Sequence, residues 1–238
     1  MTEPLPTLLL PGLLGSPRLY APQLPALWQF GPVIVADHRR DDSIAAIARR
    51  ILAHAPPRFS LLGLSMGGYI ALELLRQAPG RIARLALLDT SARADAPEQR
   101  LRRGELIELA RAGRFDEVAD LAYPGLVHPD RLADQALRAT VRSMAQDTGA
   151  EAFIRQQTAI MNRPDSRADL AAIGCPTLVL VGEADQLTPP ARAQEIAAGI
   201  RGAQLVEVPA SGHLSTLEQP ERVTAALVAW LATPEGSP

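Results

Sequence analysis

Along the chain, short apolar runs alternate with longer amphipathic segments. Each run is apolar at nearly every position rather than at every second one, which is typical of strands buried on both faces of a parallel sheet. The runs occupy residues 7–10, 32–37, 59–64, 82–89, 176–182 and 204–209. Because helical segments separate them, the pattern predicts right-handed strand–helix–strand units. We therefore expect an α/β fold with a mostly parallel sheet of about six strands and helices on both faces.

The intervening segments place apolar residues at helical spacing. Residues 42–55 put Ile44 and Ile51 on one face of a helix. Either Asp42 or Ser43 is expected to cap the start of this helix. Further helices are expected at residues 66–80, 189–200 and 219–231.

The alternation stops between residues 97 and 169, where no strand pattern is present. Apolar residues instead recur at helical spacing in four segments, at residues 97–113, 114–123, 130–146 and 150–161. We expect residues 114–167 to form a small helical cap inserted after the fourth strand, with residues 1–113 and 168–238 forming the core. Ligands of such folds bind outside the carboxyl edge of the sheet, where a cap would lie. The alternative is that the segment only covers the core.

Composition narrows the function classes. The 238 residues carry a formal net charge of −2 and no block of basic residues, so nucleic acid is not an expected partner. All 24 basic residues are arginine, which excludes a lysine Schiff base and a P-loop that needs a lysine. Since Cys175 is the only cysteine, no intrachain disulfide can form.

The sequence also predicts where the protein is located and whether it needs a cofactor. The N-terminal segment lacks the charged start of a signal peptide, and no apolar stretch is long enough for a membrane span. We therefore expect a cytoplasmic protein without a membrane partner. The histidines lack the spacing of a metal site, so neither a metal nor another cofactor is expected. The sequence carries no signal for an oligomeric state.

The third apolar run ends at Ser65, which stands between Gly63 and Gly67 in the segment GLSMG. A serine at this spacing, between a strand and a helix, is typical of a nucleophile presented on a tight turn. Side chains at both glycine positions would collide across such a turn. The strain, about 1–3 kcal/mol, must be held by the surroundings. The alternative is an ordinary glycine-rich strand–helix connection.

A serine hydroxyl is a weak nucleophile and needs a base. His213 follows the sixth run, so its imidazole is expected at the same edge of the sheet as Ser65. The other histidines fit this place less well: His38, His54 and His128. The base in turn needs a carboxylate that holds its tautomer. We prefer Asp185 for this part over Glu183, because Glu183 directly follows the strand end and Asp185 reaches further into the loop.

An oxyanion formed at the serine needs two N–H donors. One is expected from the backbone of Met66, which follows Ser65 at the start of a helix. The other is expected from the loop after the first run, PGLLG, where Leu13 follows Gly12. The alternative is that this loop is only a tight turn.

Four segments together resemble the α/β-hydrolase superfamily along nearly the whole chain: PGLLG, GLSMGG, GEADQLTPP and SGHLSTLEQP. The order of serine, acid and histidine along the chain is also that of the superfamily. The resemblance implies that Ser65 is the nucleophile, Asp185 the acid and His213 the base. It also implies that Leu13 and Met66 are the oxyanion donors. The nearest likeness is to small capped carboxylesterases and enol-lactonases.

Three features depart from the usual pattern of the superfamily. Pro11-Gly12 stands where many members carry His-Gly, so we expect the support of this loop to be altered. The segment DHRRDDS, at residues 37–43, lacks the glycines that are common after that strand. The usual first hairpin strands are also expected to be absent, since the chain begins almost at the oxyanion strand.

The expected function is hydrolysis of a small carboxylic ester or lactone through an acyl-enzyme. With the same triad, the alternatives are carbon–carbon bond hydrolysis, perhydrolysis, acyl transfer to another acceptor, or a ligand receptor with slow turnover. Arg142 and Arg155 in the helical segment would suit a substrate carboxylate, although solvated helix faces explain them equally well.

Overall fold

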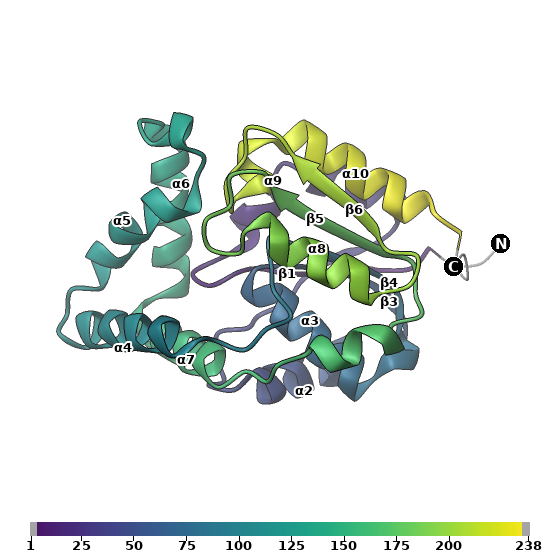
Figure 1. Cartoon of the computed structure of the whole chain (residues 1–238), viewed down its shortest axis with the longest axis horizontal. Helices are drawn as coiled ribbons and strands as arrows, with labels where there is room; N and C mark the ends of the chain where they lie inside the picture. The colour runs from purple at the N-terminus through teal and green to yellow at the C-terminus, as the bar shows by residue number, and fades with distance from the viewer. Residues whose placement is uncertain (1–3, 235–238) are drawn as a thin grey trace.

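The computed structural model describes residues 4–234, and its centre is one parallel sheet of six strands in the order β2-β1-β3-β4-β5-β6. This confirms the expected α/β fold. The strands are β1 (Thr7–Leu10), β2 (Val33–Val35), β3 (Phe59–Leu64), β4 (Ile82–Leu88), β5 (Thr177–Gly182) and β6 (Gln204–Val208). Each lies within one of the six apolar runs. Figure 1 shows how the labelled strands are arranged in the sheet.

The strand order changes direction at β1, which has β2 on one side and β3 on the other. The chain leaves β1 for the outer strand β2 and returns to β3, so the loops after β1 and β3 start side by side. Leu10, the last residue of β1, is paired with Gly63 near the end of β3. Such a switch point at the carboxyl edge is where open α/β sheets bind ligands.

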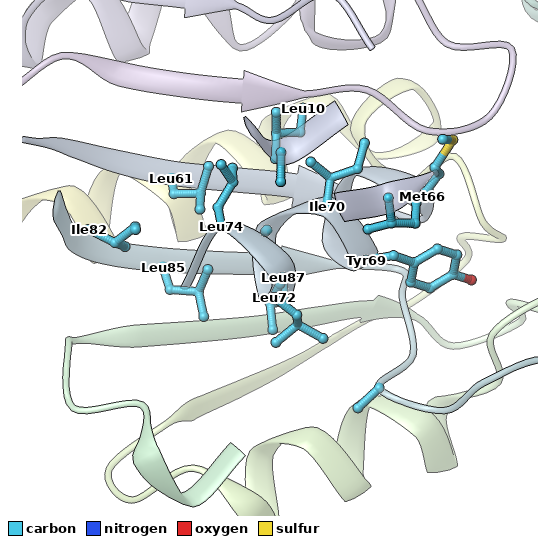
Figure 2. Packing of buried hydrophobic residues seen from close by; sticks show 14 of the residues in the cluster. Leu10, Leu61, Met66, Tyr69, Ile70, Leu72, Leu74, Ile82, Leu85 and Leu87 are labelled. Atoms are coloured by element: carbon cyan, nitrogen blue, oxygen red, sulfur yellow. The ribbon is translucent and has the colours of Figure 1, made fainter. Parts of the chain in front are cut away.

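Alternate residues of the central strands enter two separate hydrophobic clusters, one on each face of the sheet. Leu61 packs with α2 (Ile44–His54), α3 (Met66–Gln77) and α8 (Pro190–Gly199), whereas its neighbour Leu62 packs with α10 (Pro220–Ala232). Figure 2 shows part of the first cluster, where residues of α3 lie against β1, β3 and β4. Burial on both faces explains why these runs lack polar interruptions.

The two edge strands are less buried than expected. β2 and β6 each have a single neighbouring strand and keep partly exposed side chains, such as Ile34 and Leu205. The prediction that every run is buried on both faces is therefore wrong for these two. An edge strand is covered by fewer side chains of the helices, because those helices pack mainly across the central strands.

The remaining helices lie between β4 and β5 in the sequence. They are α4 (Pro97–Arg111), α5 (Phe115–Leu126), α6 (Gln135–Thr148) and α7 (Ala150–Met161). Figure 1 shows them together at one end of the sheet, towards which the arrows of β5 and β6 point. α4 packs against α7, and α5 packs against α6. The cap boundaries at residues 114 and 167 stay a prediction, with α4 lying beside the proposed cap.

Short helices complete the fold: α1 (Leu24–Leu27), α9 (Ser215–Glu218) and the 3-10 segments η1 (Pro17–Tyr20), η2 (Trp28–Phe30), η3 (Pro79–Arg81), η4 (Pro129–Arg131) and η5 (Arg167–Ala172). Ser43 caps α2, since its Oγ accepts a 3.2 Å hydrogen bond from the Ala46 N–H. Of the two residues considered for this cap, Asp42 and Ser43, the structure uses the second. None of the helices in residues 4–234 has the length and apolarity needed to cross a membrane.

Candidate active site

Ser65 occupies a sharp turn between β3 and α3. Its backbone has φ 55° and ψ −116°, in a region that residues with a side chain rarely adopt. Two contacts, one with the end of β4 and one with the segment that follows it, hold the turn. The Ser65 N–H donates to the Leu88 carbonyl at 2.9 Å, and the Thr90 hydroxyl donates to the Ser65 carbonyl at 2.8 Å. These bonds offset a backbone strain of about 1–3 kcal/mol and fix the position of the serine hydroxyl.

The glycines around Ser65 are required by the closeness of the backbone. A Cβ atom at Gly63 would overlap the carbonyl oxygen of Gly67. A Cβ atom at Gly67 would overlap the carbonyl oxygen of Leu10, at the end of β1. Neither oxygen belongs to a side chain that could move aside. The small residues therefore let α3 start close to the ends of β1 and β3.

His213 and Asp185 lie together at the same edge of the sheet. Asp185 belongs to the acid loop (residues 183–189) after β5, and His213 belongs to the histidine loop (residues 209–214) after β6. Both are buried, and 2.8 Å separates His213 Nδ1 from Asp185 Oδ2. The Asp185 carboxylate also accepts hydrogen bonds from the Leu187 N–H, the Thr188 N–H and the Thr188 hydroxyl. Its orientation is thus set by its own loop.

Glu183 takes a different place. Its side chain is exposed and accepts a 2.7 Å hydrogen bond from the Ala210 N–H, so it supports the histidine loop from outside. Of the two acidic residues weighed for the acid, only Asp185 contacts His213 among the hydrogen bonds of residues 4–234.

The environment favours the charged forms of both partners. Burial alone would raise the pKa of Asp185, but the attraction of His213 and the hydrogen bonds from His213 and Thr188 outweigh it and lower the pKa. Burial alone would lower the pKa of His213, but the carboxylate of Asp185, with smaller contributions from Asp89 and Glu218, raises it. The pair is therefore suited to stabilising an imidazolium that forms during a reaction.

Among the described residues, no hydrogen bond joins the Ser65 hydroxyl to His213. The contact with Asp185 uses Nδ1 of the imidazole, so when the ring is neutral its proton lies on Nδ1 and Nε2 is the basic nitrogen. Contacts between a nucleophile and its base are commonly long in a protein without substrate. The structure thus places both residues at one edge of the sheet without joining them.

The oxyanion loop (residues 11–16) follows β1 and passes close to Ser65. A Cβ atom built on Gly12 would lie 3.3 Å from the Ser65 Cβ. Leu13 comes next and is partly buried. The N–H of Leu14, a residue with φ 58°, donates to Gln156 Oε1 of α7 at 3.2 Å. The loop is therefore tied to a helix from the inserted region.

Met66 is the first residue of α3, and its side chain is fully buried. The first N–H groups of a helix have no acceptor within the helix. They point along the axis towards the N-terminus, where they attract negative charge. The N–H of Met66 thus has the character that an oxyanion donor needs, and its part in the reaction stays a prediction, as does that of Leu13.

Sequence reasoning missed a second buried carboxylate at this edge. Asp89 follows β4, and its Oδ1 accepts from the Gly182 N–H at 2.8 Å while its Oδ2 accepts from the Ser215 hydroxyl at 2.5 Å. Burial, and then repulsion from Asp185, hold the pKa of Asp89 well above its ordinary value. Its place after a buried strand, like that of Asp185, is a signal that could have found it.

A third buried carboxylate lies between the histidine loop and the inserted helices. Glu218 accepts hydrogen bonds from the Gly212 N–H at 2.8 Å and from the His128 N–H at 2.6 Å. Next to these contacts, the Leu214 N–H donates to the Leu126 carbonyl at the end of α5. Leu214 is thus bound directly to the end of the first helix of the proposed cap, and Gly212 is linked through Glu218 to His128, two residues beyond that helix.

The two arginines considered for a substrate carboxylate are engaged elsewhere. Arg142 binds Asp120 through two hydrogen bonds of 2.8 and 2.9 Å, and Arg155 donates to the Arg39 carbonyl at 2.9 Å. Solvated helix faces thus account for both. Within residues 4–234, no group of three or more histidine, cysteine, aspartate or glutamate residues is arranged to hold a metal ion.

A six-stranded parallel sheet with a serine on a strained strand–helix turn, and an Asp–His pair at the same edge, defines the α/β-hydrolase class. The sequence profile of the alpha/beta hydrolase family matches residues 3–226, and the chain belongs to this family.

Relatives of known structure cover nearly the whole chain. A thermophilic esterase from Thermogutta terrifontis is 30% identical with a TM-score of 0.85, over 97% of this chain and 90% of the esterase chain. The enol-lactonase from Burkholderia xenovorans LB400 is 27% identical with a TM-score of 0.89, over 98% of this chain and 93% of that chain.

Curated relatives are similar along most of their length. RutD from Variovorax paradoxus is 30% identical over 94% of this chain and 91% of its own. A pimeloyl-acyl-carrier-protein methyl ester esterase from Neisseria meningitidis is 27% identical over 86% of this chain and 83% of its own. The protein is accordingly an α/β hydrolase of the esterase type.

Proposed function

We propose that the protein is a serine hydrolase that cleaves a small carboxylic ester or lactone through an acyl-enzyme on Ser65. The observation that carries the proposal is the buried His213–Asp185 pair, joined at 2.8 Å, at the sheet edge where the strained turn presents Ser65. The esterase and enol-lactonase among the similar structures support this substrate class.

In the first half of the proposed reaction, Ser65 Oγ attacks the carbonyl carbon of the ester and His213 Nε2 takes the hydroxyl proton. The carbonyl oxygen becomes an oxyanion and accepts hydrogen bonds from the N–H groups of Leu13 and Met66. Asp185 stabilises the imidazolium through Nδ1. The bond from the carbonyl carbon to the alkoxy oxygen then breaks, and the proton on His213 passes to that oxygen, so an alcohol leaves.

In the second half, water attacks the acyl carbon and gives a proton to His213. The bond between Ser65 Oγ and the acyl carbon breaks, His213 returns the proton to Ser65, and a carboxylic acid leaves. With a lactone the alcohol and the acid remain in one molecule. No metal or other cofactor takes part in the proposed steps.

The inserted helices are proposed to form the cap at residues 114–167 and to select the substrate. Their large apolar residues mostly serve the fold, since Tyr123, Met144 and Phe153 are buried in the hydrophobic cluster on the α10 face. Selectivity is therefore expected from other parts of the cap, near its contacts with Leu14 and Gly212.

The proposal is tested with Ser65→Ala and a small activated ester such as p-nitrophenyl acetate. Turnover should fall to the background rate while the melting temperature stays close to that of the wild type. Full activity of the variant would rule out the mechanism.

The same triad suits other acyl acceptors and donors, so the substrate panel needs breadth. The name of RutD refers to carbamate hydrolysis, and the earlier alternatives include carbon–carbon bond cleavage, perhydrolysis and acyl transfer. A panel of esters, lactones, carbamates and β-diketones, with and without hydrogen peroxide, separates these reactions. A burst of one product per protein followed by almost no turnover would instead favour a slow receptor.

A further inference from the structure

His38 lies against the oxyanion loop, and the mechanism above gives it no part. It follows β2, is 2% exposed, and its Nε2 lies 3.0 Å from the carbonyl oxygen of Gly12. Burial lowers the pKa of His38, although the hydrogen bond to Gly12 opposes this, so the ring is neutral at pH 7. A neutral imidazole carries one N–H, and a carbonyl oxygen only accepts. The proton therefore lies on Nε2, and His38 donates to Gly12.

The acceptor of this bond belongs to the same peptide unit as an expected oxyanion donor. The Gly12 C=O and the Leu13 N–H are the two ends of one planar trans peptide, so they point in opposite directions. Fixing the carbonyl direction therefore also fixes the N–H direction. Rotation of this peptide about its neighbouring bonds would change the direction of the Leu13 N–H together with that of the Gly12 carbonyl.

Two donors converge on the Gly12 carbonyl. Besides His38, the Gly15 N–H donates to it at 2.9 Å and closes a turn within the oxyanion loop. The Gly15 bond moves with the loop, whereas His38 reaches the loop from a separate segment of the core, after β2. The contact from His38 thus holds the direction of this peptide relative to the sheet. Hydrogen bonds in series also polarise the amide modestly, which makes its N–H a better donor.

We propose that His38 is a positioning residue of the oxyanion hole: by donating to the Gly12 carbonyl, it aims the Leu13 N–H at the oxygen that becomes negative when Ser65 attacks. The inference rests on the proposed function, because it requires a reaction with an oxyanion at Ser65. His38 itself does not touch the substrate. Its effect should therefore appear in the rate of the chemical step rather than in substrate binding.

The test compares three variants with the wild type on p-nitrophenyl acetate. His38→Met keeps the volume of the side chain and removes the donor, so kcat should fall about 10–100-fold, less than the 10²–10³-fold typical of deleting a whole oxyanion donor, with KM within threefold. His38→Gln restores an N–H at a similar reach and should recover most of kcat. His54→Met, at the exposed end of α2, is the matched control and should stay within twofold.

A tetrahedral boronic acid inhibitor adds a second readout, because its Ki should rise by the same factor as kcat/KM falls. A merely structural His38 would lower Tm or raise KM in both His38 variants without the Gln rescue, and that result overturns the proposal. Unchanged kcat in His38→Met overturns it as well. Ser65→Ala separates the two ideas: if Ser65→Ala stays active, the proposed function fails, whereas an inactive Ser65→Ala beside a fully active His38→Met refutes only the role of His38.

If His38→Met does not fold, NMR spectroscopy of the wild-type protein tests the role of His38 instead. In a sample with ¹⁵N-labelled histidine, the proposal requires His38 to be neutral with its proton on Nε2. It also requires the Nε2–H resonance to shift when the boronic acid binds, since the polarised peptide then donates to the inhibitor. A proton on Nδ1, or a resonance that the inhibitor leaves unchanged, would overturn the proposal.

Discussion

Asp89 and Ser215 share a hydrogen bond of 2.5 Å between Oδ2 and the hydroxyl, and neither side chain reaches solvent. The other carboxylate oxygen of Asp89 holds the Gly182 N–H at the end of β5. Since Gly182 precedes the acid loop and Ser215 follows the histidine loop, one carboxylate joins the two segments that carry Asp185 and His213. Asp89 thereby links the segments of the proposed acid and the proposed base.

Asp89 should make stability depend on pH in a defined direction. Its pKa is raised in the folded protein by burial and by Asp185, so its contribution to stability is complete below the unfolded value of about 3.9 and is lost as pH rises through the raised pKa. Asp89→Asn does not titrate. In urea unfolding, the stability of Asp89→Asn minus that of the wild type should therefore increase between pH 5 and pH 8.

The matched control is Asp42→Asn, the same substitution at an exposed position before α2. A difference between Asp89→Asn and the wild type that is constant over this pH range would show that burial does not perturb Asp89 as described.

The His213–Asp185 pair predicts the acid limb of the pH profile. His213 must be neutral to act as a base, and its pKa is raised by Asp185, so kcat/KM should rise with pH through a value above the ordinary histidine pKa of about 6.5. Asp185→Asn should lower kcat about 10³–10⁴-fold and move the remaining limb to lower pH. A limb that stays in place in the variant would mean that another group titrates.

Glu218 should link the inserted helices to the histidine loop. In Glu218→Gln, only one of the two N–H groups, from Gly212 and His128, can keep an acceptor, because the new amide group is itself a donor. Leaving one buried donor unsatisfied costs roughly 1–3 kcal/mol, so Tm should fall by about 2–12 °C, and kcat should fall as His213 loses its support. Calorimetry and ester kinetics check both effects, with Glu117→Gln on the exposed side of α5 as control. An unaltered Tm would show that Glu218 does not link the inserted helices to the histidine loop.

Replacing glycine with alanine should have opposite effects on stability at Gly67, in the turn, and at Gly104, in α4. Gly67→Ala should prevent a stable native fold, because its Cβ overlaps the Leu10 carbonyl. Gly104→Ala, in the middle of α4 with no atom within 4 Å of the new Cβ, should stabilise by about 0.5–1 kcal/mol. Soluble yield and urea unfolding compare the two. A folded, active Gly67→Ala protein would contradict the geometry of the turn.

Much of this architecture can be predicted from the sequence, because each strand is indicated by a short run of neighbouring residues. Apolar runs located all six strands, and the β3 run matches the strand from Phe59 to Leu64 residue for residue. Ser65, Asp185 and His213 follow the third, fifth and sixth strands, and these positions alone predict that all three lie at one edge of the sheet. The exposure of β2 and β6 could not be read in this way, because it depends on which strands are at the edges of the sheet.

The supporting residues were hidden because their roles depend on distant partners. His38 acts on Gly12, Asp89 on Gly182 and Ser215, and Glu218 on His128, and none of these pairs is marked by spacing in the sequence. The altered support expected for the oxyanion loop from Pro11 stays a prediction, and only the fold shows that His38 contacts the loop. Side-chain direction after a strand end is set by packing, which a single sequence does not reveal.

The acyl-enzyme on Ser65 is tested most directly by mass spectrometry after treatment with a fluorophosphonate. Because the chain has no lysine, trypsin cuts only at arginine and releases residues 59–76 as one peptide, which contains both Ser65 and Ser60. Ser60 lies buried within β3 and serves as the internal control. The account predicts one adduct per chain, on Ser65, and loss of ester hydrolysis in step with labelling. An adduct on another residue, or full hydrolysis by the labelled protein, would contradict it.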